Sequence, residues 1–139
     1  MPIQPDDICL NKAAVIERAL RRMKEEYVAC PKLDNYTNVD AMTLNIERAC
    51  QAAIDLAMHL VAREHAGIPQ NSADAFVLLE KAGLLQAETV KEMMAMTGFC
   101  NVAVHEYREL DMGILRAIAE DRWKSLVRFC QQLGTTIKP

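Results

Sequence analysis

The stretch GFCNVAVHEY, residues 98–107, gathers side chains that could do acid–base chemistry within a few residues. His105 can serve as a general base or acid near neutral pH. The hydroxyl of Tyr107 can donate to a phosphate or accept a transferred group. A helix advances about 100° per residue, so Asn101 and His105 share one face, and Cys100 and Tyr107 share another. His105 and Tyr107 converge only if the helix ends or distorts just after His105; otherwise they are a hydrogen-bonded core histidine and a packing tyrosine.

A second polar line runs through Arg48, Gln51, Asp55 and His59, whose spacing places them on one helical face. The pair Asp55 and His59 could orient a base or hold a metal ion. A solvated face or a dimer surface with a few ion pairs is the alternative, and the sequence favours it. Three histidines without a cysteine pair or an HExxH pattern make a weak case for metal, so we expect no metal site.

These side chains must be positioned by helices, because helix-forming residues dominate and no segment alternates with period two. We expect an all-α bundle of four main helices plus a short helix. Arg122 interrupts the apolar stripe of the last helix, where it could extend to solvent or reach a phosphate or carboxylate. The expected helices are residues 7–29, about 40–64, a short helix capped by Ser72 and closed by Gly83, a helix from about Ala87 into residues 98–107, and one from Asp111 to Gly134.

Composition narrows the class of protein. The 139 residues fit a single domain, 1–139, and the net charge of −3 argues against a general nucleic-acid coat protein. The start lacks the features of a signal peptide, and no apolar run is long enough to span a membrane. Five cysteines without a CxxC pair indicate reduced thiols in a cytoplasmic protein, with Cys9, Cys50 and Cys130 buried as small hydrophobes.

The segment MTGFCNVAVHEYREL resembles the signature region of the HEPN superfamily, and more closely that of the HepT toxins of HepT–MntA toxin–antitoxin systems. The family motif is Arg, four to six residues, His, one residue, Tyr. His105 and Tyr107 match it, Cys100 stands at the position of the Arg, and Asn101 often follows that Arg. The segment LNIERACQAAIDLAMHLVAREHAGIPQNSADAFVLLEKAGLL is similar to the family's second and third helices, and the resemblance covers roughly residues 7–133.

The resemblance implies a HEPN-type antiparallel bundle that forms a homodimer, with the motifs of two protomers facing each other across an interface cleft. It implies the toxin of a type VII-like system: a metal-independent endoribonuclease in which the ribose 2′-OH attacks the adjacent phosphate. His105 would act as base or acid, with Asp55, His59 and Arg48 as candidate supporting residues. A minimal nucleotidyltransferase antitoxin, MntA-like, would silence it by moving AMP from ATP to Tyr107. The toxin itself would need no cofactor.

Cys100 departs from this pattern, because a thiol offers neither the permanent charge nor the forked donors of Arg. Losing one preorganised transition-state donor costs roughly 10²–10³ in rate, so we expect an impaired nuclease. The change could be introduced to disarm a toxin, or it could mark a natural member that binds without cutting. The alternatives are a non-catalytic HEPN dimer that binds RNA or nucleotide or docks the nucleotidyltransferase, a purely structural helical dimer, and a redox role for Cys100.

Overall fold

The computed structural model describes residues 3–105 and 111–139, and for residues 102–105 it describes the backbone alone. Every regular element within these ranges is helical, which confirms the expected fold class. In chain order the elements are α1 (Asp7–Ala29), α2 (Tyr36–Arg63), α3 (Ser72–Lys81), α4 (Ala87–His105), α5 (Met112–Ala117), the π-helical turn η1 (Ile118–Arg122) and α6 (Lys124–Gln132).

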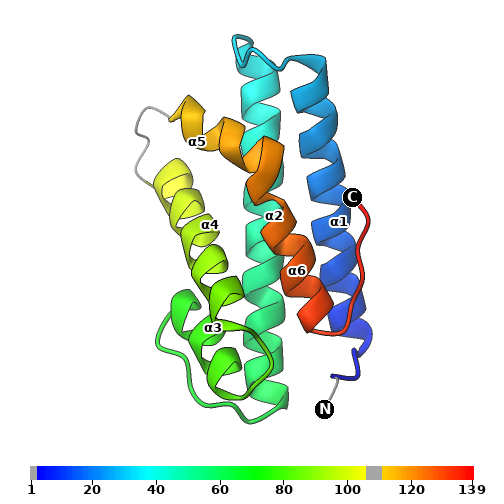
Figure 1. Cartoon of the computed structure of the whole chain (residues 1–139), viewed down its shortest axis with the longest axis vertical. Coiled ribbons are helices and arrows are strands. Elements are labelled where there is room, and N and C mark those ends of the chain that lie inside the picture. Colours follow the sequence, from blue (N-terminus) through cyan, green and yellow to red (C-terminus); the bar gives the residue numbers. More distant parts are fainter. Residues whose placement is uncertain (1–2, 106–110) are drawn as a thin grey trace.

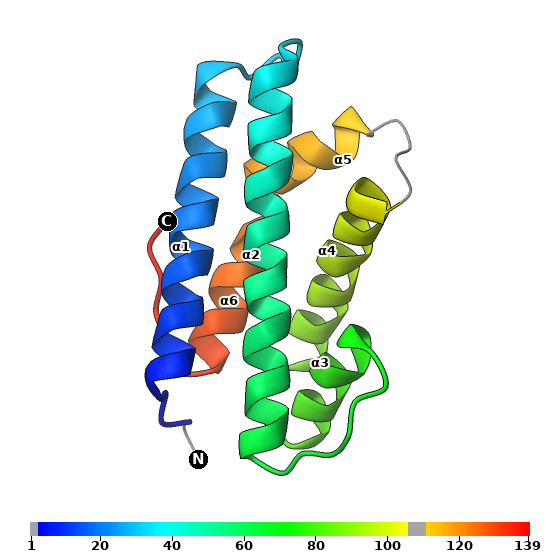
Figure 2. The same ribbon diagram turned by 180° about the vertical axis from the view of Figure 1, so that it is seen from behind.

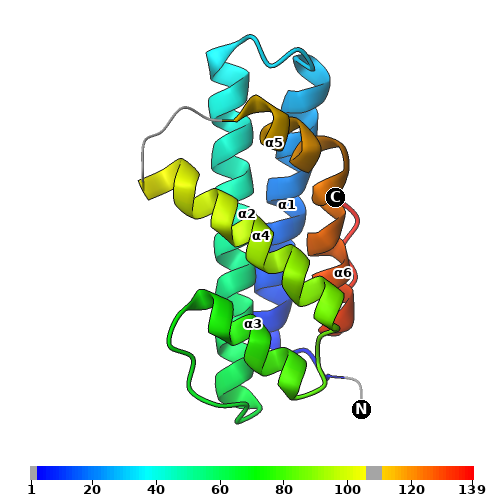
Figure 3. The same ribbon diagram turned by 60° about the vertical axis from the view of Figure 1, so that its left-hand side comes forward.

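Helices α1 and α2 form the long antiparallel pair at the centre of the bundle (Figures 1 and 2). The apolar stripe of α2, which includes Met42, Ile46 and Leu60, is buried, and its alanines Ala49, Ala53 and Ala57 allow neighbouring helices to approach closely. Helices α3 and α4 pack against α2, and α4 crosses it obliquely (Figure 3). The segment from α5 to α6 passes over α2 between α4 and α1 (Figure 1).

One aromatic contact joins the two halves of the core. The rings of Phe76 on α3 and Phe129 on α6 meet edge to face, 5.7 Å apart with an interplanar angle of 78°, and both side chains are fully buried. Such a pair contributes about 0.5–1.5 kcal/mol beyond the burial of its area. This contact packs α6 against α3, whose N-terminus lines the cavity of the candidate site.

The starts of two helices differ from the expectation. The second helix begins at Tyr36 rather than near Asp40, because Asn35 caps it by accepting from the backbone N–H groups of Thr37 and Asn38. The third helix is capped by Asn71, not Ser72, since the Asn71 side chain accepts from Asp74 N–H at 2.9 Å. In both places a polar side chain that looked like part of the loop is the cap.

The last helix is not continuous, and this changes the place of Arg122. The backbone N–H of Trp123 donates to the carbonyl of Ile118, five residues earlier, at 3.1 Å. One extra residue in the turn rotates Trp123 onto the buried side, where it packs against the core, and leaves Arg122 exposed. The expectation that Arg122 interrupts the apolar stripe is therefore wrong.

None of the helices in the part of the chain that the structure covers is both long and apolar enough to cross a membrane.

Candidate functional site

The residues singled out by sequence lie at the C-terminal end of α4. Cys100 is half-buried and Asn101 is exposed in the penultimate turn of this helix. The backbone of His105 forms the last residue of α4, one turn beyond Asn101. The side chain of His105, the whole of Tyr107 and the expected convergence of the two lie outside the described residues.

A cavity of about 700 Å³ opens beside Cys100 and Asn101. One wall is α2, a second is the second half of α4, and the N-terminus of α3 closes one side. Its lining is Leu44, Glu47, Arg48, Cys50, Gln51, Ile54, Asn71, Ser72, Ala73, Met94, Thr97, Gly98, Cys100 and Asn101.

The lining combines one guanidinium, that of Arg48, with one carboxylate, that of Glu47, and several amide groups. Arg48 is the one cationic side chain among the described residues that line the cavity, and it is exposed. Within the described ranges it forms no ion pair, so its guanidinium is open to a ligand. Gln51, Asn71 and Asn101 add amide donors. The sequence predicts Ser72 only as a helix cap and places neither Asn71 nor Ser72 at the site; their position before an apolar run was the available signal.

Cys100 does not stand alone in the cavity wall. Its thiol lies 4.0 Å from the carbonyl oxygen of Ile46 on α2, and the thiol of Cys50 on α2 lies 3.8 Å from the carbonyl oxygen of Met96 on α4. The two thiols are also within hydrogen-bonding range of each other. The hydrogen bond with Cys100, followed by burial, raises the pKa of Cys50 well above its usual value. Cys50 is buried as expected, but its neighbour was not anticipated.

Asp55 and His59 are engaged with α1 rather than with each other. Asp55 pairs with Lys12 at 3.4 Å and accepts from Gln51 at 3.0 Å. His59 Nε2 lies 2.7 Å from a carboxylate oxygen of Asp6, the residue that caps α1. Neither is among the described residues that line the cavity, so both hold α1 against α2.

Asp6, Cys9 and His59 place potential metal ligands within 4.8 Å of one another. Their donors are already engaged, because Asp6 also accepts from the backbone of Cys9 and pairs with Arg63 at 3.3 Å. The Cys9 backbone hydrogen bond, followed by that of His59, holds the pKa of Asp6 well below its usual range. Burial raises the pKa of Cys9, which disfavours the thiolate that a metal needs. The cluster is thus explained as the anchor of α1.

An all-helical bundle of this order, with a polar cavity beside the end of its fourth helix, defines a HEPN-type protein. The family model described as Ribonuclease HepT-like matches residues 10–133, so the chain belongs to the HepT-like family. This match confirms the resemblance to HepT toxins that the sequence motif indicated.

Two curated relatives are similar over much of their length. The mRNA nuclease HepT of Shewanella oneidensis is 33% identical over 125 residues, covering 89% of this chain and 94% of the relative. The tRNA nuclease HepT of Aphanizomenon flos-aquae is 32% identical over 83 residues, covering 57% of this chain and 56% of the relative.

Solved structures of toxin–antitoxin complexes are also similar to this chain. The tri-AMPylated Shewanella oneidensis HEPN toxin in complex with MNT antitoxin superposes with a TM-score of 0.88 at 32% identity, covering 93% of this chain and 98% of that one. A toxin–antitoxin structure with AMP-PNP gives a TM-score of 0.87 at 31% identity, with 92% and 98% covered.

Proposed function

We propose that this chain is the RNA-cleaving toxin of a toxin–antitoxin pair, an endoribonuclease that works without metal and is silenced by AMP transfer to Tyr107. Membership of the HepT-like family supports the activity, and the nuclease names of both relatives agree with it. The observation that carries it to this chain is the cavity lined by Arg48 of α2 and by Asn101 of α4, which lies one turn before His105. The relatives differ in the RNA they are named for, so the RNA class stays open.

The reaction is an internal transesterification. The ribose 2′-OH attacks the adjacent phosphorus, His105 takes the proton, and the bond to the 5′-oxygen breaks as that oxygen is protonated. The products carry a 2′,3′-cyclic phosphate and a 5′-hydroxyl. Donors beside the cavity, Asn101 and Arg48, contact the phosphate oxygens as negative charge develops on them.

Cys100 weakens this reaction. In the family motif a guanidinium occupies its position, with permanent charge and two parallel donors. The Cys100 side chain has neither feature; its thiol lies 4.0 Å from the Ile46 carbonyl oxygen and within hydrogen-bonding range of Cys50. We expect a rate lower by roughly 10²–10³ than with Arg at this position. Arg48 is then the one cation among the described residues of the cavity wall.

The missing charge also favours a second candidate function. A HEPN dimer that keeps the cavity and loses the catalytic cation would bind RNA or nucleotide, or dock the nucleotidyltransferase, without cutting. Such a dimer would retain the dependence of RNA binding on Arg48 and show no dependence of RNA integrity on His105.

Control of the toxin by an antitoxin is the second part of the proposal. We propose that the chain forms a homodimer in the cytoplasm and pairs with an MNT-type antitoxin that consumes ATP, while the toxin itself uses no cofactor. The support is the solved relative, which is AMPylated and bound to its MNT antitoxin. AMP on Tyr107 would add bulk and negative charge to the His–x–Tyr motif, and both would exclude an RNA phosphate from it.

Metal-free RNA cleavage tests the proposal. The full chain, in excess over RNA because cleavage is expected to be slow, is incubated in chelator, and the new ends are mapped. His105→Asn should abolish the 2′,3′-cyclic ends. His65→Asn is the matched control, because His65 is exposed and its φ of 55° is tolerated by Asn. Equal cleavage by the two variants would contradict the role of His105.

A further inference from the structure

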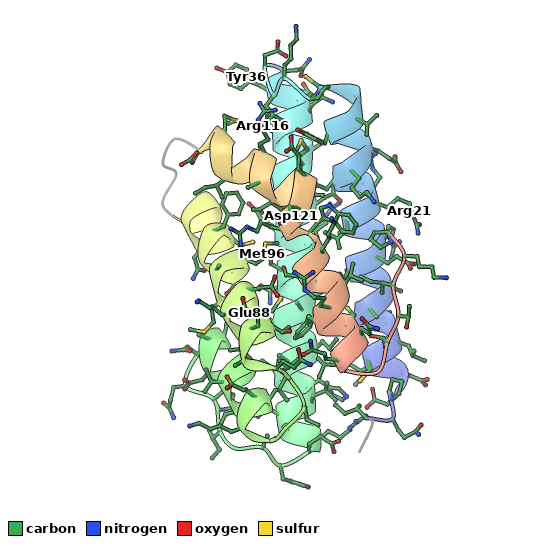
Figure 4. The ribbon with its side chains drawn as sticks, in the orientation of Figure 1. Arg21, Tyr36, Glu88, Met96, Arg116 and Asp121 are labelled. Atoms are coloured by element: carbon green, nitrogen blue, oxygen red, sulfur yellow. The ribbon has the colours of Figure 1, made fainter. Side chains whose placement is uncertain are left out.

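The pair formed by Cys50 and Cys100 has a reciprocal geometry. Each thiol reaches the carbonyl that lies one helical turn before the other cysteine: Cys50 reaches Met96 at 3.8 Å, and Cys100 reaches Ile46 at 4.0 Å. Met96 is buried on α4 and is labelled in Figure 4; Figure 3 shows how α4 crosses α2. Each side chain therefore extends toward the helical turn that carries the other cysteine, and the two thiols lie within hydrogen-bonding range of each other where α4 crosses α2.

The two thiols differ in access. Cys50 is 1% exposed, whereas Cys100 is half-buried, and both line the open cavity. A small oxidant entering the cavity therefore meets Cys100 first. The other cysteines are engaged separately: Cys30 with Asp34, Cys9 beside Asp6, and Cys130 with Thr135.

We propose that Cys50 and Cys100 form a site of reversible oxidation, at which a hydroperoxide converts the two thiols into a disulfide that joins α2 to α4. In the first step the Cys100 sulfur attacks the peroxide, the O–O bond breaks, and a sulfenic acid and water form. In the second step the Cys50 sulfur attacks the Cys100 sulfur, and the sulfenic oxygen leaves as water. Two thiols and one hydrogen peroxide thus give one disulfide and two waters.

The environment of Cys50 sets the pace of the second step. The raised pKa of Cys50 keeps it protonated at neutral pH, and the thiolate is the nucleophile. Closure should therefore speed up as pH rises. The disulfide would fix α4 against α2 one turn before His105, and it would consume the residue that stands at the motif position. This proposal does not depend on RNA cleavage.

Mass spectrometry of the full chain tests it. The reduced protein is treated with hydrogen peroxide at pH 7 and pH 9, free thiols are alkylated, and tryptic peptides are mapped without reduction. We expect a linked peptide pair containing Cys50 and Cys100, formed several-fold faster at pH 9 and reversed by dithiothreitol. Cys30→Ser, which changes a partly exposed thiol outside the pair, should leave the linked peptide unchanged.

Variants separate the pair from a single reactive thiol. In Cys50→Ala the linked peptide should vanish, and Cys100 should proceed to the sulfinic acid because no resolving thiol is left. Circular dichroism verifies that the Cys50→Ala variant is folded. The peptide map of the unsubstituted chain tests the proposal even if this variant does not fold. An unchanged chain that yields sulfinic acid at Cys100 and no linked peptide would overturn the proposal.

Discussion

Arg48 on α2 and Cys100 on α4 line the same cavity, so its wall holds the guanidinium of Arg48 and, at the position where the family motif has Arg, a thiol. The cavity retains amide donors from Gln51, Asn71 and Asn101. This arrangement leaves one guanidinium and several amide groups at the cavity and lacks the group best suited to stabilise the transition state. The predictions below follow from that division between binding and catalysis.

Arg48→Ala should weaken RNA binding. A charge-assisted hydrogen bond contributes about 1.5–3 kcal/mol, which corresponds to roughly 10–100-fold in Kd. The salt dependence of log Kd should fall by about one phosphate contact. Fluorescence anisotropy with a labelled single-stranded RNA measures both. Arg18→Ala, on an exposed position of α1 outside the cavity, is the control; the idea fails if the two variants bind alike.

Tyr107 should be the acceptor of AMP. Incubation with a cognate MNT-type antitoxin and ATP should raise the intact mass by whole AMP units, and Tyr107→Phe should remove this increase. Tyr36→Phe is the matched control, because Tyr36 is 88% exposed and is the first residue of α2 (Figure 4). Modification that survives in Tyr107→Phe would assign the acceptor elsewhere.

Asp6 should make stability depend on acid pH. Its pKa is lowered in the folded protein by the Cys9 backbone N–H, then by His59, so its contribution is present above the unfolded pKa of about 3.9 and is lost as pH falls toward the folded value. Asp6→Asn should reduce Tm at pH 7 and flatten the decline of Tm below about pH 4. Asp7→Asn, which changes the exposed neighbouring carboxylate, should give the same dependence of Tm on pH as the unsubstituted chain. Parallel profiles for Asp6→Asn and the unchanged chain would refute this role.

The π-helical turn predicts that alanine substitution lowers the free energy of unfolding much more at Trp123 than at the adjacent Arg122. Trp123 packs against the core with the Lys24 ammonium 4.2 Å from its ring centre, and Arg122 is exposed. Trp123→Ala should therefore cost up to about 3 kcal/mol of unfolding free energy, below the range for a fully buried Trp. Arg122→Ala should stay within about 0.5 kcal/mol. Urea denaturation compares them, and a larger loss for Arg122→Ala would show that the turn is wrongly placed.

Helical periodicity was enough to predict what depends on local sequence. The 7–29 helix and the buried stripe of α2 follow from apolar spacing, and Asp111 is the cap of α5 as expected. Periodicity of 3.6 residues could not predict the extra residue at Ile118–Arg122, because a π turn depends on tertiary packing.

In the candidate site, too, contacts between residues distant in sequence could not be predicted from helical periodicity. The spacing of Asp55 and His59 allowed a mutual pair but favoured a face with a few ion pairs, and it could not name the partners, Lys12 and Asp6, which lie more than 40 positions away in sequence. Cys50 and Cys100 are likewise joined only by the crossing of α2 and α4. The family motif located the cavity's α4 wall, whereas Asn71 and Ser72 reach it through the packing of α3.

The central claim is that the missing charge at position 100 limits cleavage. We would measure single-turnover cleavage of a defined RNA in chelator by the unchanged chain, Cys100→Arg and Cys100→Gln. The cavity leaves room for either longer side chain, and Gln supplies length without charge. The account predicts a gain of roughly 10²–10³ for Arg alone, abolished by adding His105→Asn. Cleavage by Cys100→Arg no faster than by the unchanged chain would contradict it and would favour the non-catalytic dimer.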